Sequence, residues 1–340
     1  MNSYQLVQDF ILNFSSILWE AMPFIVLGAV VAGVLEELLP QQLIGRIMPK
    51  HPVPAVIIGG LLGLIFPMCE CGIVVVMRRL LRKGLPLSCC VTYMLAGPIV
   101  NVVVMFSTYV AFGPHGIGWQ MVALRAGIGF VVACVAGLVV HRLQKKSNIH
   151  DLLTDLAAPP KVKALNVLDP EEVKDAKKPW LQRLGNISST AMHDFLDITV
   201  FLILGAILAA SAKSFIDPND LTRLSRDMPI LAIPAMMFLA VVMCLCSEAD
   251  AFVAASFTEM SVSSKISFLV LGPMLDLKLL MMYTRVFKTK LIVTIVTCTV
   301  VQTLIYSLIL HVLYNPAPGN ASATVSTAPA APATPATPKP

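Results

Sequence analysis

The sequence predicts an all-α membrane protein that crosses the bilayer several times. Of its 340 residues, 56% are hydrophobic and only 13% are charged, whereas a soluble domain has about 25% charged residues. Long apolar windows recur along the chain, each of the length that a helix needs to cross about 30 Å of hydrocarbon. Two further apolar stretches, 53–80 and 229–257, are each interrupted near the middle by a Cys-x-Cys motif and an acid.

The uninterrupted apolar windows predict six spanning helices. They cover residues 17–39, 86–112, 119–140, 189–212, 266–283 and 291–313. Two polar segments divide the chain further, a central one that we interpret as a cytoplasmic linker and a tail of Pro, Ala and Thr whose composition cannot bury a core. The predicted units are a first transmembrane repeat over 1–140, the linker over 141–185, a second transmembrane repeat over 186–314 and a disordered tail over 315–340.

The two halves are predicted to be repeats, because unusual residues recur at one spacing. Cys69 and Cys71 are followed 175 positions later by Cys244 and Cys246. The same spacing relates the later motifs "LAGPIVN" and "VLGPMLD", which contain Asn101 and Asp276, respectively. Duplication is the simplest explanation of this correspondence.

The basic residues at span ends predict the topology. They gather near Arg78, in the central linker, near Arg285 and, more weakly, at Arg46 and Lys50, and all of these loops should face the cytoplasm. If the interrupted stretches were full spans, giving eight in total, the Arg285 loop would lie outside. If each enters and returns as a re-entrant hairpin, every basic loop lies inside. Each half then has three spans, an odd number, so the repeats are inverted; a broken full span remains the alternative.

The interrupted stretches carry the candidate site, because non-helical backbone at membrane depth must be buried by protein or line a wet cavity. Glu70, Glu248 and Asp250 lie beside the two Cys-x-Cys motifs. Carboxylates at this depth are candidates for substrate contact or proton relay. Alternatively, they stabilise the N-termini of half-helices through the helix dipole. The Ser247-x-x-Asp250 spacing is typical of such an N-terminal cap.

The thiols of Cys69, Cys71, Cys244 and Cys246 are candidates for substrate binding and for metal ligation. Thiolates select soft species such as Cu(I), Zn(II) and, by the same softness, trivalent arsenic. The alternative is that these residues are small buried hydrophobes, which is how we interpret the other cysteines. A disulfide within either motif is not expected, because thiols one residue apart would form a strained ring.

Two more features point to polar positions within the spans. Pro98 and Pro273 predict kinks that free backbone carbonyls, and Asn101 and Asp276 then line a substrate pathway unless the kinks are purely structural. His193, Asp194 and Asp197 fall along one helix face. These three residues form either an ion entry or simply the polar start of a span.

Several motifs resemble those of a known family. The segments "FPMCECG", "RRLLRKGLPLS", "LAGPIVN", "STYVAFG" and "CSEADAFVAASF" are similar to those of the predicted permeases that include the arsenical permeases. The resemblance covers roughly residues 10–313. It implies a polytopic inner-membrane permease of two related halves, in which the four cysteines of the interrupted stretches bind trivalent organoarsenicals. Val75 and Val102 stand where the pattern usually has proline, and both changes fall near the site.

Together these observations predict a multi-pass permease of the cell inner membrane that moves a small solute, such as a trivalent arsenical or another soft metalloid, by alternating access. The alternatives are a copper or zinc transporter and a membrane scaffold or redox subunit that moves nothing. No Walker motif, nucleotide loop or His-Glu-x-x-His motif occurs in the sequence, so we expect neither an enzyme nor a cofactor. The expected partners are the solute and the bilayer, not nucleic acid, and the oligomeric state is open.

Overall fold

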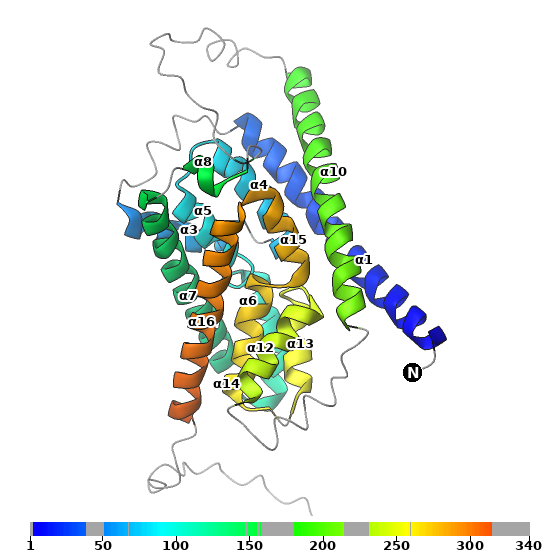
Figure 1. Cartoon of the computed structure of the whole chain (residues 1–340), viewed down its shortest axis with the longest axis vertical. Coiled ribbons are helices and arrows are strands. Elements are labelled where there is room, and N and C mark those ends of the chain that lie inside the picture. Colours follow the sequence, from blue (N-terminus) through cyan, green and yellow to red (C-terminus); the bar gives the residue numbers. More distant parts are fainter. Residues whose placement is uncertain are drawn as a thin grey trace, which may run out of the picture.

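The fold is a bundle of long and half-length helices (Figure 1). The computed structural model describes residues 3–38, 51–66, 68–146, 149–154, 157, 180–213, 231–258 and 260–314. Within these residues the chain is helical apart from one isolated bridge between Leu153 and Phe287. The all-α polytopic class predicted from composition is therefore confirmed. The predicted tail 315–340 lies outside the described residues.

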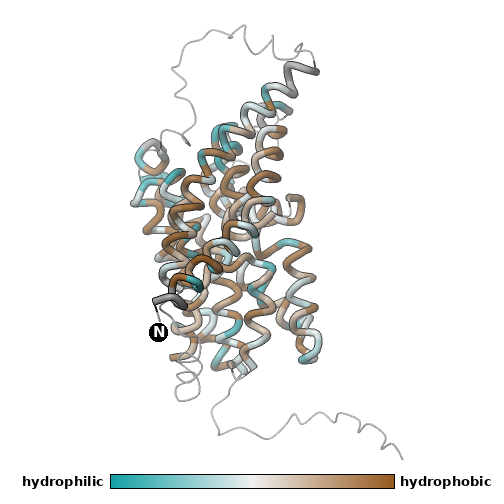
Figure 2. The backbone as a smooth tube through the Cα atoms, turned by 90° about the vertical axis from the view of Figure 1, so that its right-hand side faces the viewer, coloured by the Kyte–Doolittle hydropathy of each residue, from teal (hydrophilic) through white to brown (hydrophobic). Residues whose placement is uncertain are grey.

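The helices of the first half are α1 (Ser3–Leu38), α3 (Pro52–Ile65), α4 (Glu70–Arg82), α5 (Leu87–Ala96), α6 (Val102–Phe112), a 3₁₀ turn η1 (Gly113–His115) and α7 (Gly118–Lys146). A short helix α8 (Ile149–Leu152) follows. The second half contains α10 (Trp180–Lys213), α12 (Ala232–Met243), α13 (Ala249–Ser256), α14 (Val262–Leu271), η2 (Gly272–Met274), α15 (Leu277–Val286) and α16 (Thr289–Tyr314). The long helices are hydrophobic over most of their length (Figure 2).

In the part of the chain that the structure describes, five helical stretches are long and apolar enough to cross a membrane: Val7–Leu35, Gly118–Lys146, Gly185–Ser211, Val262–Val286 and Thr289–Tyr314. The sixth span, expected over 86–112, is not one helix. It is divided into α5 and α6 at residues 97–101, and the Val262–Val286 stretch is divided in the same way between α14 and α15. Proline ends the helix at both divisions, because it lacks the N–H that would continue the ladder.

The first interrupted stretch is a re-entrant hairpin. Helix α3 runs beside α5 in the same direction, since Gly59 lies against Cys89 and Gly63 lies against Gly97. The chain turns after Phe66, and α4 then leads back to the end from which α3 came. The absence of side chains at these glycines allows the two backbones to approach closely. The stretch is therefore folded back on itself rather than continuous, while its entry and return on one side of the membrane stays a prediction.

The second interrupted stretch has the same form at the other end of the bundle. Helix α12 packs against α14 as α3 packs against α5, with Ala240 beside Gly272. Helix α13 then returns to the starting end. Figure 1 places α3, α4 and α5 in the upper half and α12, α13 and α14 in the lower half. The elements thus follow one order in both halves with opposite direction; their origin by duplication stays a prediction.

We call the upper end in Figure 1 the basic end, because α4 and α15 lie in that half and have basic residues in their last turns, Arg79 and Arg82 in α4 and Arg285 in α15. The start of the central segment lies there too. Thr154 N–H donates to the Val286 carbonyl (3.1 Å), and Lys288 N–H donates to the Leu152 carbonyl (2.9 Å). The described basic loops therefore share one end, as the topology requires; Arg46 and Lys50 lie outside the described residues. Helices α7 and α10 extend into the two ends of the predicted linker.

Candidate functional site

The two Cys-x-Cys turns are buried inside the bundle. The first turn leads directly into α4, whose first residue is Glu70, and the second leads into α13. The thiols of Cys69, Cys71, Cys244 and Cys246 are all buried. Cys71 contacts Cys69 through their thiols, and the Cys246 thiol contacts the carboxyl group of Glu20 on α1. The turns therefore place soft ligands within the protein, away from lipid.

Glu70 forms an ion pair with Lys278, the second residue of α15. Lys278 Nζ lies 2.9 Å from Glu70 Oε1 and 3.5 Å from Asp276 Oδ2, and it also donates to the Cys244 carbonyl at 3.2 Å. Cys244 adopts a left-handed backbone conformation with φ of 49°, which ends α12 and directs the chain away from the helix axis. One ammonium group therefore joins both halves at the second turn.

A second charged pair lies between α7 and α13. Arg125 Nη2 lies 3.8 Å from Asp250 Oδ2 and donates to the Ser247 carbonyl at 2.7 Å. Arg125 also donates to Thr108 Oγ1 on α6 at 2.8 Å. Both members of the pair are at most 3% exposed. Like Lys278, Arg125 binds a backbone carbonyl that the break before α13 leaves without a helical partner.

Asn101 and Asp276 have equivalent structural roles. The Asn101 side chain caps α6 by accepting from Val103 N–H (2.9 Å), and the Asp276 side chain caps α15 by accepting from Leu279 N–H (2.6 Å). Of these two residues, only Asp276 lies beside the ion pair of Glu70 and Lys278, because its carboxylate is close to the Lys278 ammonium group. The expected Ser247 cap is wrong. Glu248 occupies the cap position of α13 without a side-chain cap bond, and it is half-buried.

No three His, Cys, Asp or Glu side chains in the described part of the chain are placed together to hold a metal ion. The eight cysteines are free thiols. Of the four site cysteines, Cys69 and Cys71 contact each other, Cys246 contacts Glu20, and the Cys244 thiol donates to the Val241 carbonyl at 3.3 Å. Their role as joint metal ligands stays a prediction.

Two glycines allow α1 and α10 to approach the half-helices of the site. A Cβ on Gly28 of α1 would lie 2.8 Å from Gly72 Cα on α4, and one on Gly205 of α10 would lie 2.7 Å from Lys278 Cα on α15. These glycines belong to the similar segments "VLGAVVAG" and "ILGAILAA". The first helix of each half therefore supports the backbone that carries one member of the central ion pair.

Comparison with known proteins places the chain in a family. The model of a family described as "predicted permease" matches residues 7–312. The chain belongs to this family. It is 37% identical to "UPF0718 protein YcgR" of Bacillus subtilis over 297 residues, covering 87% of this chain and 95% of that protein. It is 32% identical over 310 residues to a Streptococcus mutans protein named "Putative two-component membrane permease complex subunit", covering 88% and 94%. No solved structure matches the chain.

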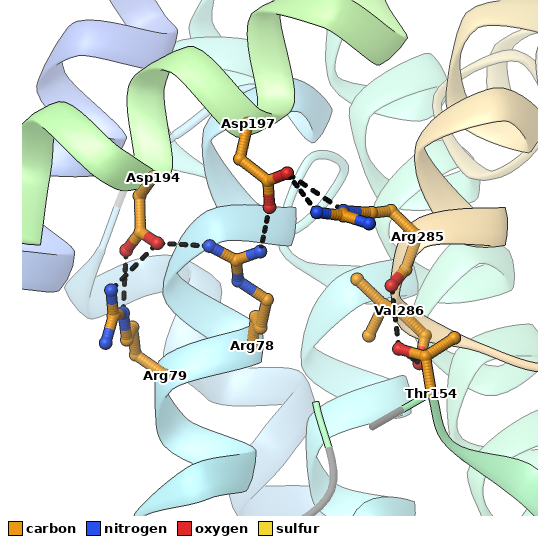
Figure 3. A network of polar contacts seen from close by, with 7 residues as sticks. All are labelled: Arg78, Arg79, Thr154, Asp194, Asp197, Arg285 and Val286. Atoms are coloured by element: carbon orange, nitrogen blue, oxygen red, sulfur yellow. Dashed lines mark hydrogen bonds and ion pairs between the residues drawn. The ribbon is translucent and has the colours of Figure 1, made fainter. Parts of the chain in front are cut away.

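A third cluster of charges in this predicted permease lies toward the basic end (Figure 3). Asp194 of α10 accepts from Arg78 and from Arg79, whose Nε lies 2.6 Å away. Asp197, one turn later, accepts from Arg78 Nη1 at 2.5 Å and from Arg285 Nε at 2.9 Å. Asp194 is 1% exposed, whereas His193 beside it is exposed. Of the three polar residues predicted along this helix face, Asp194 and Asp197 thus join α10 to α4 and α15, whereas His193 does not.

Sequence patterns did not single out Lys278, Arg125 or Glu20 as site residues. A usable signal was present, because an ionisable residue inside an apolar span is a functional candidate by default. Lys278 and Arg125 both stand within otherwise apolar runs. The arginines at positions 78, 79 and 285 were interpreted only as markers of orientation, and the structure shows them as partners of buried acids.

Proposed function

We propose that this protein is a permease of the cell inner membrane that carries a small solute by alternating access, and that the solute is a soft metalloid such as a trivalent organoarsenical. The observation that supports this proposal is the burial of thiols beside a charged centre between the two halves. Broken helices at membrane depth are typical of transporter sites. The basic end faces the cytoplasm in this proposal.

Methylarsenite, CH₃As(OH)₂, suits two neighbouring thiols. Each thiol gives its proton to one hydroxyl of the arsenical, so two As–S bonds form and two waters leave without any change of oxidation state. The Cys69 and Cys71 thiols already contact each other, and the other turn carries two more buried free thiols, Cys244 and Cys246. Thiols prefer soft arsenic over hard cations. The reverse reaction with water releases the solute.

The test measures methylarsenite uptake into everted membrane vesicles. We expect Cys71→Ser and Cys246→Ser each to abolish uptake, because a hydroxyl replaces the soft sulfur ligand. The matched control is Cys134→Ser on α7, half-buried and distant from both turns in sequence, which should transport normally. Unchanged uptake in the two site variants would exclude the thiol role.

A transporter of copper or zinc is distinguished by metal analysis of the purified protein, since the arsenical proposal expects neither metal to be bound in stoichiometric amount. The third alternative is a membrane scaffold that transports nothing. It would be favoured if proteoliposomes show no flux of arsenicals, antimonite, copper or zinc and the protein has a stable partner. The printed name of the Streptococcus mutans relative makes a partner subunit worth testing by pull-down.

A further inference from the structure

One acid of each re-entrant segment is paired with a base from the other half. Glu70 on α4 of the first half pairs with Lys278 on α15 of the second. Asp250 on α13 of the second half pairs with Arg125 on α7 of the first. All four side chains are at most 4% exposed. Both pairs therefore join the two halves, but the acid comes from the first half in one pair and from the second half in the other.

By the centre we mean the region between the two Cys-x-Cys turns. The Glu70 and Lys278 pair lies on the side of this region that leads to the basic end. Helices α4 and α15 contact each other and extend toward that end (Figure 1). Two turns further along, Arg78 of α4 and Arg285 of α15 both bind Asp197 (Figure 3). The interface between α4 and α15 is thus fastened at its inner and outer ends, and it lies between the centre and the basic end.

The Asp250 and Arg125 pair lies on the other side of the centre. Helix α13 contacts α6 in the lower half of the bundle. Arg125 joins these two helices, because it binds Thr108 on α6 as well as the Ser247 carbonyl before α13. This interface lies between the centre and the opposite end.

Both bases retain a partner when their ion pair opens. Lys278 has Asp276 on its own helix, 3.5 Å away, and Arg125 has Thr108 of its own half. An opened pair therefore leaves only the acid without its counter-charge. Because an uncompensated buried charge is costly, opening both pairs at once is strongly disfavoured.

We propose that one route leads from the centre to the basic end and a second route leads to the opposite end. The Glu70 and Lys278 pair is the inner gate of the first route, and the Asp250 and Arg125 pair is the inner gate of the second. The two gates open in alternation. The proposal rests on the alternating-access function above. It adds Lys278 and Arg125 to that function as positioning residues, which hold the second Cys-x-Cys turn through its carbonyls while their gates are closed.

The test uses no transported solute, so its outcome is separate from that of the arsenical assay. The full chain is placed in sealed vesicles of each orientation, treated with a membrane-impermeant maleimide, and its labelled cysteines are identified by mass spectrometry. We expect Glu70→Gln to raise Cys71 labelling from the basic end about tenfold or more, because the open state is otherwise a minor population. Asp250→Asn should raise Cys246 labelling from the opposite end.

The matched control is Asp9→Asn, a carboxylate-to-amide change at an exposed position of α1, which should not alter labelling. The charge exchange Glu70→Lys with Lys278→Glu should restore the low labelling of the native protein if the pair itself is the gate. Equal increases from both ends in each variant would mean that the pairs merely brace the fold, and this would overturn the proposal. Unchanged labelling in correctly folded variants, judged by gel filtration, would also overturn it.

Discussion

The contacts on the two sides of the charged centre differ in kind. Toward the basic end, α4 and α15 are joined by Glu70 with Lys278 at the centre and by Asp197 with two arginines further out. Toward the opposite end, Arg125 makes one longer ion pair and two hydrogen bonds. The contacts toward the basic end are therefore the stronger set, because each of them joins an acid to a base.

The largest effect is expected from removing a central base. Lys278→Met leaves two buried carboxylates, Glu70 and Asp276, without their shared cation, and breaking such a pair costs about 3–5 kcal/mol. Arg125→Met leaves only Asp250 without a charged partner and should cost less. Thermal unfolding of both variants in detergent measures the difference. A greater loss for Arg125→Met would reverse the ranking of the two routes.

The next largest loss of stability is expected from the cluster of Asp194, Asp197 and their arginines toward the basic end. Asp194→Asn weakens the bonds from Arg78 and Arg79, each a hydrogen bond between charged groups, and we expect a loss of about 2–3 kcal/mol. The neighbouring exposed residue offers the control, since His193→Gln should leave the unfolding midpoint unchanged. Comparable midpoints for the two variants would show that the cluster does not stabilise the basic end.

A smaller effect is expected from the helix contacts that support the two half-helices. Gly205→Ala places a methyl group 2.7 Å from Lys278 Cα, and such overpacking costs about 1–2 kcal/mol. Gly28→Ala should behave similarly against α4. Gly127→Ala on α7 is the matched control, because a Cβ there meets no atom within 4 Å. If Gly205→Ala is as stable as Gly127→Ala, α10 does not position α15.

The smallest effect is expected at the exposed end of α4. Arg82 is exposed, and a surface substitution of this kind changes stability by about 0.5 kcal/mol or less. Arg82→Gln should therefore unfold at nearly the native temperature, unlike variants of the buried cluster. A large loss would indicate that positive charge in general, rather than the buried pairs, holds the basic end together.

Much of the topology followed from the sequence. Length and hydropathy predicted the long helices, and the side of each basic loop predicted the hairpins at 53–80 and 229–257. The structure shows long apolar helices and folds both stretches back on themselves, while their entry and return on one side of the membrane stays a prediction. The division of the expected span 86–112 was anticipated only as a kink, because a proline in an apolar run predicts a break without giving its extent. The Ser247 cap was wrong because tertiary contacts of the turn decided where α13 begins.

The sequence predicted most of the acids and thiols of the candidate site, but not the side chains with which they form ion pairs. Glu70, Asp250, Asp276 and the four cysteines were recognisable because acids and thiols stand out in apolar sequence. Their partners were not, since Lys278 is separated from Glu70 by most of the chain. Ion pairs between halves depend on how distant helices pack, and no local pattern records that.

The sequence by itself determined the class of the protein, its long helices and the places where the chain breaks, because hydrophobicity, proline and charge act on neighbouring residues. Only the tertiary structure decided which acid meets which base, and that the arginines at the basic end bind Asp194 and Asp197 rather than water. The physical reason is that a buried charge must find a partner wherever the packed helices provide one.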